Sequence, residues 1–218
     1  TMDEITDYLA AIDEKVDDVL RAQKDAVVAR AIGAGMVMDE AMTIREHGGR
    51  VNEVTWSKVQ TVPTTIAETQ AYALRQLDAL AEKLESKTAV GDLAKVAKEA
   101  EKSVLEWLAV LARCFQLQDA IAVLELDRVL TATPEDLDGH RLGLRAARQD
   151  RRVLISERTE RLLNRLDVVA TMANRKVFLH PTTAGSIVRS SNHTASALIE
   201  FDALLGIDRE RANLEVRR

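Results

Sequence analysis

The amino-acid sequence predicts an all-α protein: an elongated antiparallel helical bundle of about five to six helices, two of them about 40 residues long. Three observations predict this class. Apolar residues recur at three- and four-residue spacing along most of the 218 residues, no alternating strand pattern of useful length interrupts them, and only 9 Gly and 3 Pro can turn the chain. With 3% aromatic residues, the core is expected to consist of Leu, Val, Ile and Ala.

The first helix is predicted by an apolar seam whose members step by 4, 3, 4 and 3 while the acidic residues lie off it. The seam consists of Ile5, Leu9, Ile12, Val16 and Val19. The pattern dissolves in AVVARAIGAGMVM, residues 26–38, which suggests a bend or a close helix crossing there. A second helix is expected to run to about Gln60, weakened at Gly48 and Gly49 because each glycine costs about 1 kcal/mol inside a helix.

The next three helices are separated by proline and glycine. Pro63 permits a new start, and Gly91 breaks the third helix before a fourth that spans about 92–131. In TATPEDLDG, Thr133 can cap a helix and Pro134 suits its first turn, so a fifth helix of about 40 residues follows.

The stretch FLHPTTAGSIV is the clearest linker, and a shorter helix follows it and ends at Gly206. We therefore expect residues 1–176 to form an elongated helical bundle. Residues 177–218 are expected to supply a linker, a C-terminal helix that packs on the same bundle, and a frayed tail.

The most apolar stretch, LAVLARCFQLQDAIAVLEL at 108–126, has the length of a transmembrane helix. However, Arg113 and Asp119 at its middle cost about 2.5–3.5 kcal/mol each on insertion, whereas each strongly apolar residue returns only about 0.3–0.6 kcal/mol. We interpret it as a central core helix in which the single cysteine, Cys114, is a small buried hydrophobic residue.

Composition and the start of the chain bear on class and location. With 46% hydrophobic residues, 30% charged residues and a formal charge of -5, the chain resembles an ordinary soluble globular protein. Its first residues are acidic where a secretory signal would be basic, so we expect a cytoplasmic protein. An excess of 21 Arg over 9 Lys hints at a GC-rich bacterial genome. Because Thr1 is not a native start and the helical periodicity is already present at Ile5, we expect either an added residue before Met2 or a segment of a longer protein.

No motif predicts an enzyme, a metal site or a cofactor. None of the four histidines follows a glutamate by three residues or has zinc-ligand spacing. Ser190, Ser191 and His193 lie together without a nucleophile-elbow motif or an assignable acid, and GAG at 33–35 lacks the rest of a dinucleotide motif. We therefore expect no catalysis, no cofactor and no small-molecule substrate.

One region is basic: residues 140–176 contain ten Lys or Arg against four acids. Arg141, Arg145, Arg148 and Arg152 follow one another by 4, 3 and 4, a stripe that suits phosphates. Residues 1–32 contain eight acids against four bases, so charge pairing inside or between subunits explains the stripe better than nucleic acid does, and the total charge is negative.

On a helical wheel, Arg151 and Arg158 fall on the inward side of the fifth helix. If the fourth and fifth helices form a hairpin that turns near Thr133, Asp119 lies beside Arg148 and Arg151. The sequence therefore predicts a buried ion pair between Asp119 and one of the arginines Arg148, Arg151 and Arg158.

Two functions from different classes remain. The favoured one is a non-enzymatic helical scaffold for protein–protein contact or oligomerisation, with a protein partner or self-association. The alternative is a membrane-active bundle that conceals the apolar segment 26–38. The ordinary explanation of this segment is that its small residues let two helices pack closely. The candidate residues of the segment are Ile32, Gly33, Gly35, Met36, Val37 and Met38.

Overall fold

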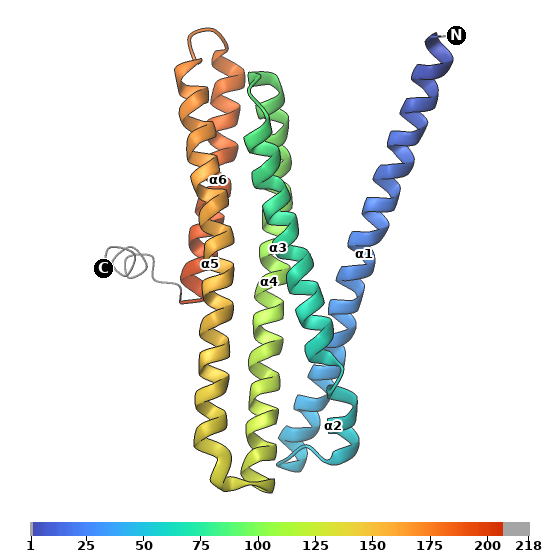
Figure 1. The fold of residues 1–218 in the computed structure, drawn as a ribbon, viewed down its shortest axis with the longest axis vertical. Coiled ribbons are helices and arrows are strands. Elements are labelled where there is room, and N and C mark those ends of the chain that lie inside the picture. The colour runs from blue at the N-terminus through green and yellow to red at the C-terminus, as the bar shows by residue number, and fades with distance from the viewer. Residues whose placement is uncertain (1, 207–218) are drawn as a thin grey trace. The chain divides into compact units, whose positions relative to one another are not determined.

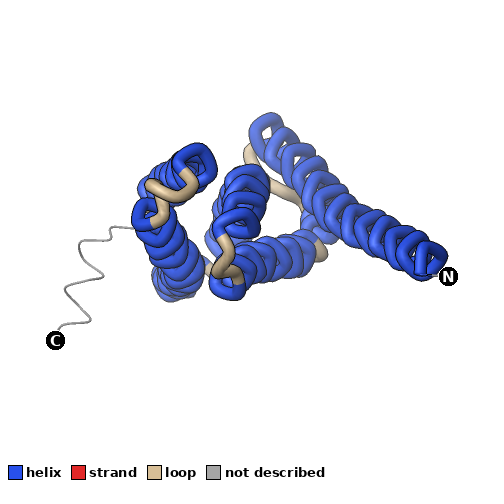
Figure 2. The backbone as a smooth tube through the Cα atoms, turned by 90° about the horizontal axis from the view of Figure 1, so that it is seen from above, coloured by secondary structure: helices blue, strands red, loops and turns tan. Residues whose placement is uncertain are grey.

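The computed structural model describes the backbone of residues 2–206 and the side chains of residues 14–16 and 18–206. Six α-helices and one short 3-10 helix account for nearly all of the described chain, and none of these residues lies in a β-strand (Figure 2). The all-α helical-bundle prediction is therefore confirmed. The expected frayed tail, residues 207–218, lies outside the described residues.

The chain divides into two compact units, residues 1–69 and 70–218, and the division falls inside helix α3, Val62–Ser86. The chain reverses direction in the short turn at 176–180, and the helix that follows packs within the second unit.

The first unit contains α1, Met2–Gly48, α2, Glu53–Val59, and the start of α3. Helix α1 runs through residues 26–38 without interruption, so the expected bend is wrong: alanine and valine there keep the helix intact. The chain breaks at Gly49 instead, because its φ of 74° is a left-handed conformation that favours glycine.

Hydrogen bonds close both sides of this break. The Gly49 amide donates to the Arg45 carbonyl at 2.8 Å, and the Asn52 side chain caps α2 by accepting from the Thr55 amide at 2.9 Å. The buried side chains of the unit come from all three of its helices. They include Val27, Ala34, Met38 and Ala41 of α1, Val59 of α2, and Val62 and Ile66 of α3.

The second unit contains the rest of α3 together with α4, Val90–Ala132, the 3-10 helix Pro134–Asp136, α5, Leu137–Arg175, and α6, Pro181–Leu204. Helices α4 and α5 have 43 and 39 residues, and the chain turns between them near Thr133, as predicted. The expected cap is wrong: the Thr133 side chain makes no capping hydrogen bond, and its carbonyl instead accepts from the Asp136 amide at 3.0 Å. Figure 1 shows them as antiparallel neighbours, with the α3–α4 turn and the α5–α6 turn together at the opposite end. Helix α6 packs against both α4 and α5.

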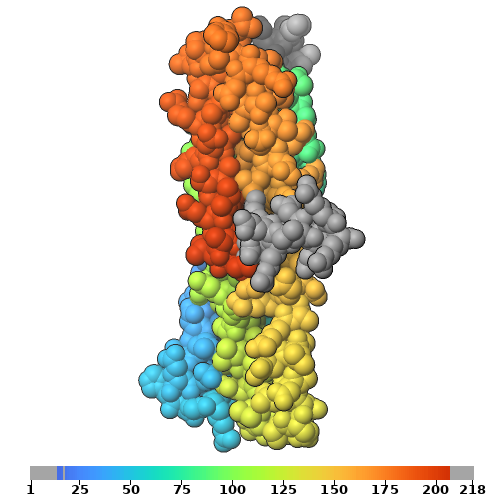
Figure 3. Space-filling model, turned by 90° about the vertical axis from the view of Figure 1, so that its left-hand side faces the viewer, coloured from blue at the N-terminus to red at the C-terminus, as the bar shows by residue number. Residues whose placement is uncertain are grey.

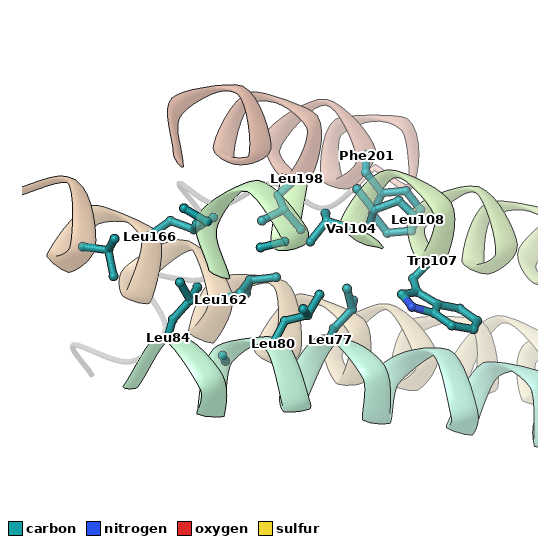
Figure 4. Packing of buried hydrophobic residues seen from close by; sticks show 14 of the residues in the cluster. Leu77, Leu80, Leu84, Val104, Trp107, Leu108, Leu162, Leu166, Leu198 and Phe201 are labelled. Carbon is teal, nitrogen blue, oxygen red and sulfur yellow. The ribbon is translucent and has the colours of Figure 1, made fainter. Parts of the chain in front are cut away.

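Apolar side chains from these four helices meet in one core (Figure 4). Leu111, Leu162 and Leu198 are fully buried, and a buried leucine contributes about 1.5–3 kcal/mol relative to an exposed one. The rings of Tyr72 and Trp107 stack obliquely at its edge, with centroids 5.4 Å apart. The labelled core residues of Figure 4 are Leu77, Leu80, Leu84, Val104, Trp107, Leu108, Leu162, Leu166, Leu198 and Phe201.

Helix α4 carries the apolar stretch 108–126. Within the described chain it is the one helix long and apolar enough to cross a membrane by length and composition alone, a test that the core helix of a soluble protein also passes. Here Leu111, Phe115 and Leu124 are buried, whereas Arg113 and Gln116 face outward. The stretch therefore packs as an inner helix with one polar side.

Candidate functional site

The apolar seam of α1 is buried along only part of the helix. Val27, Ala34 and Ala41 recur every seven residues and are buried. Leu20 lies one heptad before Val27 and so occupies the same heptad position, and Val16 lies four residues before Leu20. These two side chains are 54% and 49% exposed, and Val19 beside them is exposed as well. The seam therefore continues beyond its buried part. The side chains of Ile5, Leu9 and Ile12 lie outside the described residues.

The segment 26–38 has two different faces. Gly35 and Met38 are buried and Val37 is half-buried, whereas Ile32, Gly33 and Met36 are exposed. A Cβ atom added at Gly33 would meet no other atom within 4 Å, so a close helix crossing does not require this glycine. One face of the segment packs in the first unit and the other is open.

The predicted pairing partner of Asp119 is Arg148. The Arg148 Nη2 atom donates to the Asp119 Oδ2 atom at 2.7 Å. Both side chains are more than two-fifths exposed, so this ion pair is half-buried. Figure 3 shows that α6, in red, covers only part of the length of its neighbouring helices. Helix α3 also comes close to this part of α4, because the Gln118 side-chain amide next to Asp119 donates to the Gln70 Oε1 atom at 2.9 Å.

Arg151 and Arg158, the other two candidate partners of Asp119, have different surroundings. Arg151 is half-buried, and burial lowers the pKa of its guanidinium while the nearby Asp119 carboxylate opposes that shift. Arg158 does not reach Asp119 at all. Its Nη1 atom donates to the Asp78 Oδ2 atom of α3 at 2.8 Å.

Arg158 belongs to an ion-pair cluster between α3 and α5 that sequence reasoning missed. Arg161 lies 3.6 Å from Asp78 and 3.4 Å from Glu85, and Arg165 also lies 3.4 Å from Glu85. The sequence does contain a signal for this cluster. Asp78 and Glu85 are seven residues apart on α3, and the three arginines of the cluster are spaced by three and four residues on α5. Complementary spacing of this kind places opposite charges along one helix contact.

In the described part of the chain, only some arginines of the basic stripe are exposed and unpaired with a carboxylate. Arg141 and Arg145 are exposed, Arg148 is paired with Asp119, and the guanidinium of Arg152 is half-buried against Gly206 at the end of α6. Two of the four arginines are therefore engaged within the second unit. What remains exposed is one helical turn of α5.

The acid missing from the Ser190 and His193 pair comes from α4. The Glu101 Oε1 atom lies 2.6 Å from the His193 Nδ1 atom. Hydrogen bonds from His193 and from the Ser190 hydroxyl lower the pKa of the Glu101 carboxyl below its ordinary value of 4.5. Glu101 accepts from both, and no Ser190–His193 hydrogen bond exists among the described residues. The imidazole is thus not placed to take the serine proton, as a nucleophilic site requires.

Cys114 is buried in α4, and burial raises the pKa of its thiol to about 11. A thiol in this state is a poor nucleophile at neutral pH, because the thiolate is the reactive form. Across the described residues, no group of three or more His, Cys, Asp or Glu side chains is placed to hold a metal ion.

Two shallow hollows lie on the second unit. One, of about 280 Å³, lies between α5 and α6 and is lined by Asn164, Asp167, Ser191 and Asn192 together with leucine and alanine side chains. The other, of about 440 Å³, lies at the end where the α3–α4 and α5–α6 turns meet. Neither hollow contains a nucleophile paired with a base.

The candidate sites of this chain are therefore surfaces and ion-pair clusters. Comparison with known proteins adds no relative: the chain matches no protein-family model, no curated protein and no solved structure.

Proposed function

We propose that this chain is a non-enzymatic, cytoplasmic helical scaffold that self-associates through the N-terminal half of α1. The observation that carries the proposal is the exposed continuation of the α1 seam at Val16, Val19 and Leu20. Single exposed apolar residues are ordinary on protein surfaces, but a row that continues a buried heptad seam is typical of helix pairing.

A second copy of the chain fits this row better than an unrelated partner. The apolar spacing of 4, 3, 4 and 3 from Ile5 to Val19 is the coiled-coil pattern, and two copies of one seam can pack on each other about a twofold axis. Acids outnumber bases beside it: Glu14 and Asp18 are exposed, and Arg21 lies 3.9 Å from Asp18 of the same helix. The proposed contact therefore depends on the apolar row and not on charge pairing between the two copies.

The membrane-active alternative has less support. It requires the apolar segment 26–38 to be available for release, yet Met38 and Ala34 are buried in the first unit. A protein partner other than a second copy remains an outcome of the following test.

The test is the oligomeric state of the full chain, measured by sedimentation equilibrium over a range of concentrations. We expect a dimer for the wild type and a monomer for the Val16→Asp/Leu20→Asp variant. Circular dichroism of the variant checks that the helix content is retained.

The matched control is Ile32→Asp/Met36→Asp, which places the same two charges on exposed apolar residues of the opposite face of α1. This variant should dimerise like the wild type. A wild-type chain that stays monomeric at all concentrations would refute self-association, as would equal loss of the dimer in the control.

A further inference from the structure

The turn between α5 and α6 exposes two large apolar side chains. Phe178 is 95% exposed, more than any other large apolar residue whose side chain is described, and Leu179 beside it is 78% exposed. Figure 1 places this turn at one end of the second unit, next to the α3–α4 turn. The pair therefore projects from a tip and does not line a helix face.

The backbone of the turn satisfies its own hydrogen bonds. The Leu179 and His180 amides both donate to the Lys176 carbonyl, at 3.1 and 3.0 Å, and the Val177 amide donates to the Asn174 carbonyl at 3.3 Å. Pro181 has no amide hydrogen to satisfy. Entry of this turn into a medium of low polarity therefore exposes few unsatisfied donors.

The charge around the turn is positive, although the whole chain carries -5. Between Asp167 and Glu200 there is no acid, while Arg175 and Lys176 stand directly before the apolar pair. The neighbouring turn adds Lys87 and is followed by the exposed Asp92, so the charge around the two turns stays positive with Arg175 and Lys176 included. The Lys176 Nζ atom donates to the Thr88 carbonyl at 3.4 Å, which links the two turns.

A hollow lies beside the apolar pair. It has a volume of about 440 Å³ and is lined by Leu179 together with Lys176, His180 and Thr183, with Val90 and Gly91 on the α4 side. Its polar wall carries a cation and hydrogen-bond donors, and its apolar wall continues to the exposed leucine.

We propose that this tip, residues 175–180, binds the surface of a bilayer that contains anionic phospholipids. Phe178 and Leu179 enter the interfacial layer, where aromatic side chains are enriched, and Arg175 and Lys176 contact the lipid phosphates. The tip does not span the bilayer.

A bilayer suits this surface better than a protein does. Protein interfaces place their aromatic anchors in the middle of a broad contact area, surrounded by residues that exclude water. Here two adjacent apolar side chains stand on a convex turn with cations just behind them, which is the arrangement of an interfacial anchor. The proposal is independent of self-association through α1.

The experiment is flotation of the full chain with phosphatidylcholine vesicles, with and without phosphatidylserine. We expect binding only to the vesicles that contain phosphatidylserine, weakening as salt is added. The Phe178→Ser/Leu179→Ser variant should bind at least about tenfold less tightly. The Arg175→Gln and Lys87→Gln changes should each weaken binding about fivefold.

The matched control is Leu130→Ser/Leu142→Ser, which removes two exposed leucines near the opposite turn. That turn carries Glu135, Asp136 and Asp138, so an anionic surface repels it. The control should bind like the wild type. No binding of the wild type to either vesicle would overturn the proposal, and so would equal binding by the Phe178→Ser/Leu179→Ser variant or equal loss in the control.

Discussion

The ion-pair cluster between α3 and α5 makes a sharp prediction about stability. The side chain of Asp78 is 11% exposed, whereas Arg158 and Arg161 are both 40% exposed. Only Arg158 lies at hydrogen-bonding distance, 2.8 Å against 3.6 Å. Loss of one partner costs about 3–5 kcal/mol for a buried pair and about 0–1 kcal/mol for a surface pair. Arg158→Leu should therefore lower the free energy of unfolding by about 1–3 kcal/mol.

Arg161→Leu is the comparison, because it removes an equally exposed arginine that lies 3.6 Å from the same carboxylate and 3.4 Å from Glu85. It should cost less than about 1 kcal/mol. The assay is urea unfolding followed by fluorescence in a Trp56→Phe background, which leaves Trp107 as the single tryptophan and places the probe in the second unit. A greater loss for Arg161→Leu than for Arg158→Leu would refute the assignment of Arg158 as the principal partner of Asp78.

Three further predictions follow from single sites. The pKa of the Glu101 carboxyl should lie below its ordinary value of 4.5, and His193→Gln should raise it, as measured by carbon NMR. Because the pKa is lower in the folded chain than in the unfolded chain, this carboxyl stabilises the fold at pH values above its unfolded pKa. That stabilisation is lost as the pH falls through the folded-state pKa. The Cys114 thiol should react with a disulfide reagent far more slowly in the native chain than in guanidinium chloride, because it is buried and its pKa is about 11. Gly49→Ala should lower the thermal midpoint at a cost of about 1 kcal/mol because of its positive φ, whereas Gly48→Ala, at the end of α1 and with open space around it, should not.

The sequence was sufficient to predict the second unit in outline. Periodicity on both sides of TATPEDLDG predicted the long helices α4 and α5 and their turn at Thr133, because apolar spacing and turn chemistry agree there. The sequence pattern was misleading at residues 26–38. This run of small and apolar residues has no clear helical periodicity, but it contains good helix formers such as alanine and methionine, so α1 continues to Gly48.

The candidate sites were harder to predict, because they depend on which helices meet. The hairpin of α4 and α5 placed Asp119 opposite Arg148 from chain order alone. The partner of Arg158 required knowledge that α3 lies against α5, and such contacts between helices distant in sequence leave only a complementary charge spacing as their signal. The Glu101 and His193 pair, 92 residues apart, gave no sequence signal for the same reason.

The distribution of arginine on α5 bears directly on the choice between partners. The helix has the charge of a phosphate-binding element, yet Arg148, Arg158, Arg161 and Arg165 all meet carboxylates of α3 or α4. A phosphate contact gains affinity from an arginine only if that arginine is free to neutralise it, and an ion pair already formed must first be broken. Four of the nine arginines of α5 therefore hold this helix against α3 and α4. This supports assembly through helix faces over binding of nucleic acid, and it leaves Arg141 and Arg145 at one end of α5 and Arg175 at the other as exposed arginines.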